Sequence, residues 1–329
     1  MKNNSEKIRN IEKYRDALFA FYKMYVSAMI LPILRITDYC ENGFKHCYGD
    51  FSCKNDIRNH MPEEDAFYIL KELKNSGYCY TVNVMGGEPS HIEKVNPGYN
   101  KRILKESLRL GLETSFETNG TWIRNKEIRV PLLQDLVHIY TKYNELFKVQ
   151  MSLDSYHKKC VYDVNKVIKK FSRALPRANQ KFQVSVMRFK HEPWFKKELT
   201  AVGNGGNMFI KNKAAWDLNK VGRAAINNLS HCRNTLGEFK EFCAKQNEFW
   251  ELSLSVINFG MIPGVPATML DFRNNGMVTA HKWHDPENRN QFQTPLKENG
   301  KYRPLDEIQA DLASQIFKDF IDKISQNQN

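Results

Sequence analysis

The sequence lacks several features, and each absence excludes a class of protein. Its seven cysteines are an odd number, so they cannot all pair with one another in a disulfide framework. The most apolar stretch, residues 17–34, is interrupted by Lys23 and Pro32, which makes it a poor membrane span. The basic first residues hold no short apolar run that ends in a small-residue cleavage site, so no secretory signal is expected. We therefore expect a cytoplasmic protein in a reducing compartment.

Two frequent enzyme motifs are also missing. The chain has no glycine-rich loop ending in Gly-Lys-Ser or Gly-Lys-Thr, and it has no Gly-x-Ser-x-Gly turn. Residues 203–206 form a lone glycine cluster, which is weak evidence for phosphate binding. A P-loop enzyme and an α/β-hydrolase are therefore disfavoured.

The chain does contain enough apolar material for a core. Of its 329 residues, 41% are hydrophobic and 12% aromatic, which excludes general disorder. This length suits one large α/β domain with a small appendage. The net charge of +12 is uneven, because residues 151–200 hold 12 lysines and arginines against 4 acidic residues. The basic region 158–197 suits nucleic acid, an acidic peptide or an anionic cofactor, but its helical spacing and lack of interleaved aromatics favour a solvated helix face.

Strand-like and helix-like segments alternate along the first two thirds of the chain. This alternation predicts a parallel sheet, either barrel-like or doubly wound. The strands are expected at residues 29–36, 80–85, 113–117, 147–153 and 182–189, and the helices at 5–28, 63–75, 101–110, 130–143 and 158–174.

The pattern changes after about residue 212. Residues 250–259 and 267–281 are expected to be strands, the second folded into a hairpin at Asn274-Asn275-Gly276, and residues 305–324 a closing helix. We therefore predict an N-terminal helix over 1–28, a barrel over 29–211 and an extension over 212–329.

Unusual residues follow four of the predicted strands. They are Cys40 with Cys47, the segment Gly86-Gly87-Glu88-Pro89, the segment Thr118-Asn119-Gly120, and Ser152-Leu153-Asp154. Ligands bind at the carboxyl ends of the strands in parallel α/β folds, so these residues are expected to meet at one site.

This ordered set resembles the radical S-adenosylmethionine (SAM) superfamily. The resemblance implies a partial (β/α)6 TIM-like barrel with a small α+β C-terminal appendage. It also implies two cofactors, SAM and a [4Fe-4S] cluster held by three cysteines spaced C-x3-C-x2-C. One electron from such a cluster cleaves SAM to a 5′-deoxyadenosyl radical, which abstracts a hydrogen atom from the substrate.

The family's functional positions carry over residue by residue, with one exception. Cys40 matches the first cluster cysteine and Cys47 the third, but Phe44 occupies the middle position and a phenyl ring does not ligate iron. The resemblance assigns the SAM site to His46, Gly86, Gly87, Glu88, Pro89, Thr118, Asn119, Ser152 and Asp154.

Phe44 leaves three explanations open. Cys53 is a substitute ligand, which gives a metal set of Cys40, Cys47 and Cys53; or the cluster is lost; or the position is altered in this particular chain. The first explanation predicts an enzyme. The second predicts a cluster-deficient protein that binds SAM or a peptide, and a third function, RNA modification, would use the basic region.

The last third adds a lesser resemblance to peptide-modifying members with SPASM or twitch extensions. It rests on Gly222-Arg223-Ala224, on residues 276–281 and on residues 304–308. It implies a peptide or small-protein substrate and a reductant protein as partners. His281 stands where the family usually has a cysteine, so no auxiliary cluster is expected.

Several histidines and cysteines lie outside this scheme. Cys232, Cys243, His281 and His284 suit a tetrahedral zinc site by residue type, although their spacing is loose and unrelated roles are favoured. His91 and His157 lie near predicted strand ends, where a histidine is either a proton donor or an ordinary polar loop residue.

Overall fold

The computed structural model describes residues 25, 29–42, 47, 51–143, 145–152, 160–174, 183–189, 209–215, 257–258, 267–280 and 292–327. The chain divides into two compact units. One contains Pro32–Asn234 with Phe272–Asn275, and the other contains Met1–Leu31, Thr235–Asp271 and Gly276–Asn329. Each is described by itself.

The first unit is built on a parallel sheet whose strands follow sequence order. The strands are β1 (Met29–Arg35), β2 (Thr81–Met85), β3 (Glu113–Thr118), β4 (Phe147–Ser152), β5 (Gln183–Phe189) and β6 (Phe209–Ala215). Each pairs in parallel with the next. The predicted fold class is confirmed, since sequential parallel strands joined by helices form a partial α/β barrel. β6 was not predicted.

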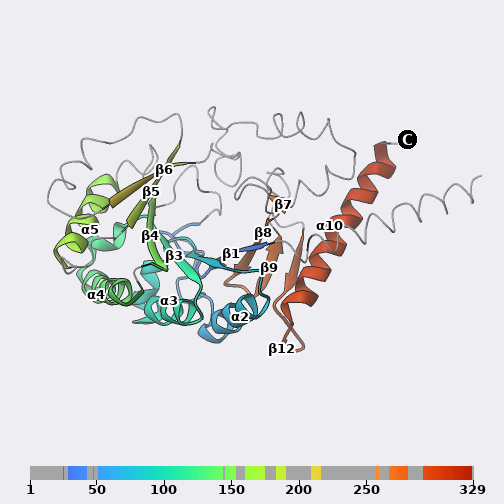
Figure 1. Cartoon of the computed structure of the whole chain (residues 1–329), viewed down its shortest axis with the longest axis horizontal. Coiled ribbons are helices and arrows are strands. Elements are labelled where there is room, and N and C mark those ends of the chain that lie inside the picture. The colour runs from blue at the N-terminus through green and yellow to red at the C-terminus, as the bar shows by residue number, and fades with distance from the viewer. Residues whose placement is uncertain are drawn as a thin grey trace, which may run out of the picture. The chain divides into compact units, whose positions relative to one another are not determined.

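Four helices lie in sequence order along one side of these strands (Figure 1). They are α2 (Glu63–Asn75), α3 (Tyr99–Arg109), α4 (Lys126–Tyr143) and α5 (Val161–Ala174). β2 and β3 alternate strictly between fully buried and half-buried residues. Val82, Val84 and Phe116 are fully buried, whereas Asn83 and Ser115 lie half-buried on the other face and hydrogen-bond to each other. One face of the sheet is therefore apolar and the other polar.

Helix α5 carries part of the basic region. Its Val164, Val167 and Phe171 are fully buried, whereas Lys170 and Arg173 are exposed. This is the expected pattern of a helix with one apolar and one solvated face.

Two short 3-10 helices were not predicted. η1 (Pro89–Lys94) follows the Gly86-Gly87 turn, and η2 (Thr121–Arg124) follows the Asn119-Gly120 turn. Their short length hides them from a search for helical periodicity. Both begin at the polar end of a strand, where the candidate site lies.

The second unit contains short strands and one long helix. β8 (Ala267–Arg273) and β9 (Met277–Ala280) flank the predicted turn, where Gly276 has a φ of 76°. The other elements are β7 (Ile257–Asn258), β10 (Gln293–Pro295), β11 (Lys297–Glu298), β12 (Lys301–Tyr302) and α10 (Leu305–Asn327). The predicted hairpin and closing helix are confirmed. No described helix is both long and apolar enough to cross a membrane.

Several predictions fall outside the described residues. They concern most of the N-terminal helix and of residues 250–259, the Gly222-Arg223-Ala224 segment, the glycine cluster at 203–206, His157, and the four candidate zinc ligands Cys232, Cys243, His281 and His284.

Candidate functional site

The loop after β1 runs beside the loop after β2. Past the ends of both strands, Ile36 N donates to Met85 O at 2.8 Å, Gly87 N donates to Thr37 O at 2.7 Å, and Glu88 N donates to Tyr39 O at 2.7 Å. The parallel pairing of β1 with β2 therefore extends into both loops. This extended pairing places Cys40 next to the Gly86–Pro89 segment, as expected from the order of the strands.

The two glycines of that segment allow this close approach. A Cβ on Gly86 would lie 2.4 Å from Thr37 O, and a Cβ on Gly87 would lie 2.0 Å from Tyr39 O. Both contacts are far inside van der Waals distance and involve backbone atoms that have no freedom to rotate away. The glycines therefore let the loop that carries Cys40 pack against β2, and the assignment of these glycines to SAM remains a prediction.

Glu88 connects the ends of β2 and β3. Its side chain is fully buried. Oε1 accepts hydrogen bonds from Ser90 Oγ at 2.5 Å, Thr118 Oγ1 at 2.7 Å and Ser90 N at 3.3 Å, and Oε2 accepts one from Asn119 N at 2.7 Å. A buried carboxylate needs such donors to offset its lost hydration. Glu88 thus holds Thr118 and Asn119 in place.

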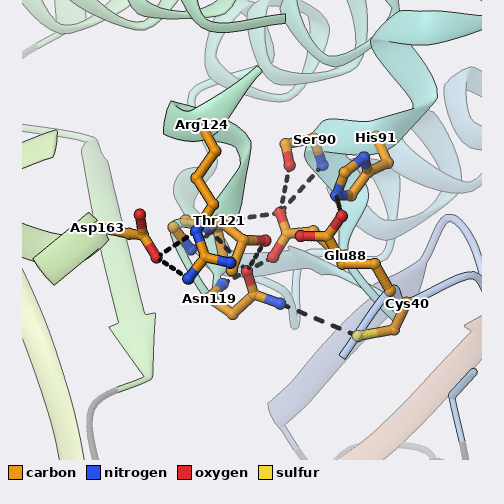
Figure 2. Close-up of polar contacts among 11 residues, drawn as sticks. Cys40, Glu88, Ser90, His91, Asn119, Thr121, Arg124 and Asp163 are labelled. Carbon is orange, nitrogen blue, oxygen red and sulfur yellow. Dashed lines mark hydrogen bonds and ion pairs between the residues drawn. The ribbon is translucent and has the colours of Figure 1, made fainter. Parts of the chain in front are cut away.

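Asn119 points toward Cys40. Its Oδ1 accepts from Thr121 N at 2.9 Å and lies 2.6 Å from Thr121 Oγ1, which fixes the orientation of the amide. Its Nδ2 then faces Cys40 Sγ at 3.9 Å. Figure 2 shows Cys40, Glu88, Ser90, His91, Asn119 and Thr121 gathered in one cluster. The ends of β1, β2 and β3 therefore converge on one thiol.

Backbone hydrogen bonds connect the segment that contains Cys53 to the loop that contains Cys40. Tyr39 and Ser52 form a parallel bridge, in which Cys40 N donates to Ser52 O at 3.1 Å and Ser52 N donates to Asp38 O at 3.3 Å. Burial raises the pKa of Tyr39, and the charges of Glu41, Cys53 and Cys40 add to this rise. The bridge places Cys53 beside Cys40 in the fold, although twelve residues separate them.

The three predicted metal ligands differ in exposure. Cys40 is buried, Cys47 is half-buried and Cys53 is exposed, and none forms a disulfide. Within the described ranges, no three histidine, cysteine or acidic side chains gather closely enough to hold a metal ion. Phe44 and His46 lie outside those ranges. The donor set fits an iron–sulfur cluster in kind, because thiolates are the usual ligands of such clusters.

The remaining predicted site residues are placed as follows. Pro89 begins η1, and its carbonyl accepts from Asn100 Nδ2 at 3.1 Å. Ser152 ends β4, opposite Met187 of β5, and is half-buried. Asp154 lies outside the described residues.

The sequence did not predict two ion pairs around this cluster. His91 Nε2 lies 3.2 Å from Glu41 Oε2. The contact with His91 is the largest cause that lowers the pKa of Glu41 to about 2, against the opposing effect of burial. Arg124 Nη2 and Nε donate to Asp163 Oδ2 at 2.5 and 2.9 Å, joining η2 to α5. Glu41, His91 and Arg124 each lie six residues past the end of a strand, whereas Asp163 lies in the first turn of α5.

The comparison with protein families agrees with this geometry. Residues 34–180 match the radical SAM superfamily. The match spans less than half of the chain, and it falls on the segment that holds β1 to β4 and the strand-end motifs. The radical SAM resemblance is confirmed for this segment. No curated protein matches the sequence.

Solved structures of radical SAM proteins are similar to the chain at low identity. SuiB from Streptococcus suis is 14% identical, with 93% of this chain and 69% of that one covered and a TM-score of 0.43. anSMEcpe with bound AdoMet and a peptide is 12% identical, with 89% and 82% covered and a TM-score of 0.46. HemN, the coproporphyrinogen III oxidase of Escherichia coli, is 10% identical, with 80% and 69% covered and a TM-score of 0.42. Likeness at this level carries no argument about substrate.

Proposed function

We propose that this chain is a radical SAM enzyme whose iron–sulfur cluster is held by Cys40, Cys47 and Cys53. The observation that carries the proposal is the Tyr39–Ser52 bridge, which sets Cys53 beside Cys40 at the strand-end site. A third thiolate is required because Phe44 stands at the middle cysteine position of the family pattern. Cys53 supplies a thiol on a segment that is already hydrogen-bonded to the backbone of Cys40.

The SAM site would be formed by the residues that surround this thiol. Glu88 Oε2 accepts one hydrogen bond from the described residues, which leaves an acceptor position for the ammonium group of SAM. Thr118 and Asn119 are held in place by Glu88 and would border the methionyl end. His46, Ser152 and Asp154 would contact the adenosyl part by the same resemblance.

When bound, the cluster and SAM supply the radical that abstracts hydrogen, and the protein supplies position and polarity. Gly86 and Gly87 let the Cys40 loop approach β2, and Glu88 fixes the end of β3. The polar face of the sheet, with Asn83 and Ser115, suits a polar substrate. We propose a peptide or small protein as that substrate and a reductant protein as the electron donor, as the resemblance of the last third of the chain to peptide-modifying members implies.

Anaerobic reconstitution followed by iron and sulfide analysis tests the ligand set. The wild type is expected to bind about four irons per chain, and Cys53→Ser is expected to lose most of them. Cys79→Ala is the matched control, because Cys79 is buried and donates to Thr81 O instead. Phe44→Cys combined with Cys53→Ser is expected to restore iron by rebuilding the usual spacing. Equal iron in wild type and Cys53→Ser would refute Cys53 as a ligand.

A second function is favoured by one observation, the phenylalanine at position 44. If the cluster is lost, the retained strand-end residues would bind SAM or a peptide without radical chemistry. An iron-free protein that still binds SAM would support this function and refute the first.

A further inference from the structure

A buried histidine contacts both neighbours of Cys40. The His91 side chain is 2% exposed, and its Nε2 lies 3.2 Å from Oε2 of Glu41, whose side chain is 33% exposed. The same imidazole packs edge-on against the ring of Tyr39, with the ring centroids 5.6 Å apart. Tyr39 and Glu41 directly precede and follow Cys40. One side chain therefore holds the loop on both sides of the proposed ligand.

His91 is itself held on a rigid element. It lies in η1, where Pro89, Ser90, Ile92 and Glu93 are also buried. The Glu93 carboxylate ties η1 to the start of α3, accepting from Gly98 N at 2.5 Å, Asn100 Nδ2 at 2.8 Å and Asn100 N at 3.0 Å. The imidazole is thus fixed to the scaffold, and the loop with Cys40 rests on it.

The contacts define which ring nitrogen matters. Nε2 lies 3.2 Å from a carboxylate oxygen of Glu41, which is a close polar contact, although neither Nε2 nor Nδ1 has a hydrogen-bond partner of good geometry among the described residues. A glutamine at position 91 carries an amide nitrogen at about the reach of Nε2, so it preserves a donor toward Glu41. A phenylalanine preserves the ring volume and the contact with Tyr39 but removes the donor. These two substitutions separate the donor from the packing.

We propose that His91 is a positioning residue that holds Tyr39 and Glu41 and thereby fixes the Cys40 thiol in its buried, ligand-ready place. Ligation of a cluster by Cys40 in this place rests on the proposed function. The restraint that His91 exerts on the loop does not depend on that function, because it involves protein groups alone.

The test measures how fast Cys40 is alkylated by iodoacetamide in the iron-free protein, with the modified cysteine identified by peptide mapping. Cys40 is 5% exposed, so its alkylation requires local opening of the loop. Loss of a close polar contact with a charged carboxylate, together with the packing of the ring, favours such opening by about tenfold. We therefore expect His91→Phe to react about tenfold faster than wild type, and His91→Gln to react at nearly the wild-type rate.

Two further variants control for general loosening. His60→Phe is the matched control, because His60 also packs edge-on against a tyrosine, Tyr99, with ring centroids 5.0 Å apart, and its ring nitrogens lie near Ile57 O and Asn96 Nδ2. It should leave the rate unchanged. Glu41→Ala removes the same His91–Glu41 contact by changing its more exposed partner, at a position where misfolding is not expected. It should also accelerate the alkylation of Cys40 about tenfold.

Equal rates in wild type, His91→Phe and Glu41→Ala would overturn the proposal, as would equal acceleration by His60→Phe or failure of His91→Gln to restore protection. Iron content after reconstitution gives the second readout: it should fall in His91→Phe and recover in His91→Gln. If the wild type binds no iron, the proposed function fails, while the alkylation rates still decide whether His91 restrains the loop.

Discussion

At the scale of single residues, Gly87 has the least room for change. An added Cβ would lie 2.0 Å from the carbonyl oxygen of Tyr39. The same oxygen accepts a hydrogen bond from Glu88 N, so it is not free to move away. Gly87→Ala is therefore expected to displace the Cys40 loop and to lower the free energy of unfolding by about 2–3 kcal/mol. Urea unfolding measures this loss.

Gly77→Ala separates this clash from ordinary backbone strain. Gly77 has a φ of 74°, but a Cβ there would meet nothing within 4 Å. It should cost about 1 kcal/mol, the penalty of a left-handed conformation alone. If Gly87→Ala cost no more than Gly77→Ala, the close packing of the two loops would be refuted.

Glu88 is the residue on which the polar cluster depends. Its carboxylate accepts four hydrogen bonds while fully buried. Glu88→Gln places an NH2 group where an acceptor is needed, so at least one donor from Ser90, Thr118 or Asn119 loses its partner. We expect a loss of about 2–3 kcal/mol in unfolding free energy.

Glu93→Gln is the comparison for Glu88→Gln. The Glu93 carboxylate is also buried and accepts three hydrogen bonds, but its partners Gly98 and Asn100 lie at the start of α3. Both variants should lose similar stability, whereas only Glu88→Gln should weaken SAM binding, as measured by equilibrium dialysis. Equal SAM affinity in both variants would show that Glu88 serves the fold alone.

At the scale of elements, the strands were easier to predict than the starts of the helices. The five predicted barrel strands were confirmed within one or two residues, because each is a short segment and turn residues follow most of them closely. Helix α4 was expected to start at Val130, just before Pro131, but it starts at Lys126. Asn125 Oδ1 accepts from Glu127 N at 2.9 Å and caps the helix. The capping signal at Asn125 therefore outweighs Pro131, although this proline lies in the second turn and removes one helix hydrogen bond.

Helices α2 and α3 are joined by an ion pair that depends on pH. Arg102 Nη2 and Nε donate to both oxygens of Glu63, at 2.6 and 2.8 Å. The hydrogen bond from Arg102 lowers the pKa of Glu63, against a smaller effect of burial. A carboxyl whose pKa is lower in the folded state adds stability above its unfolded pKa, about 4.3, and loses it as pH falls through the folded value.

We expect Glu63→Gln to cost about 0.5 kcal/mol at pH 7, because both side chains are partly exposed and solvent screens the pair. The difference from wild type should shrink as the pH falls below about 4.3, and it should also shrink in 0.5 M salt. Glu64→Gln is the control, because Glu64 lies in the same first turn of α2 but is exposed. A Glu63→Gln effect that persisted unchanged at pH 2 would contradict the role of the ion pair. Urea unfolding at both pH values gives the measurement.

At the scale of the whole molecule, the order of the strands and helices could be predicted from the sequence. The contacts between loop residues that are far apart in the sequence could not. The alternation of segments predicted a parallel sheet, and the four strand-end motifs predicted one site at its edge, since the carboxyl ends of parallel strands share an edge whatever their side chains do. The bridge from Tyr39 to Ser52 and the contact of His91 with Glu41 join residues 13 and 50 positions apart. No periodicity encodes such contacts, because they depend on the path of a loop.

The net charge of +12 provides a way to distinguish a peptide-modifying enzyme from an RNA-modifying enzyme, because it makes RNA binding sensitive to salt. Lysines and arginines that neutralise phosphates release counterions, so RNA affinity from this charge should fall by about 100-fold or more between 50 and 200 mM salt. SAM carries little net charge and would be held by short hydrogen bonds around Glu88, so its affinity should change less than about twofold. Filter binding with a mixed-sequence RNA and equilibrium dialysis with SAM give the two salt profiles.

Replacing the exposed Lys170 and Arg173 of α5 by glutamine should reduce the salt dependence of RNA binding and leave SAM binding unchanged. RNA binding that withstood 200 mM salt and preferred one sequence would instead favour RNA as the substrate, because base recognition and not phosphate charge would then carry the affinity.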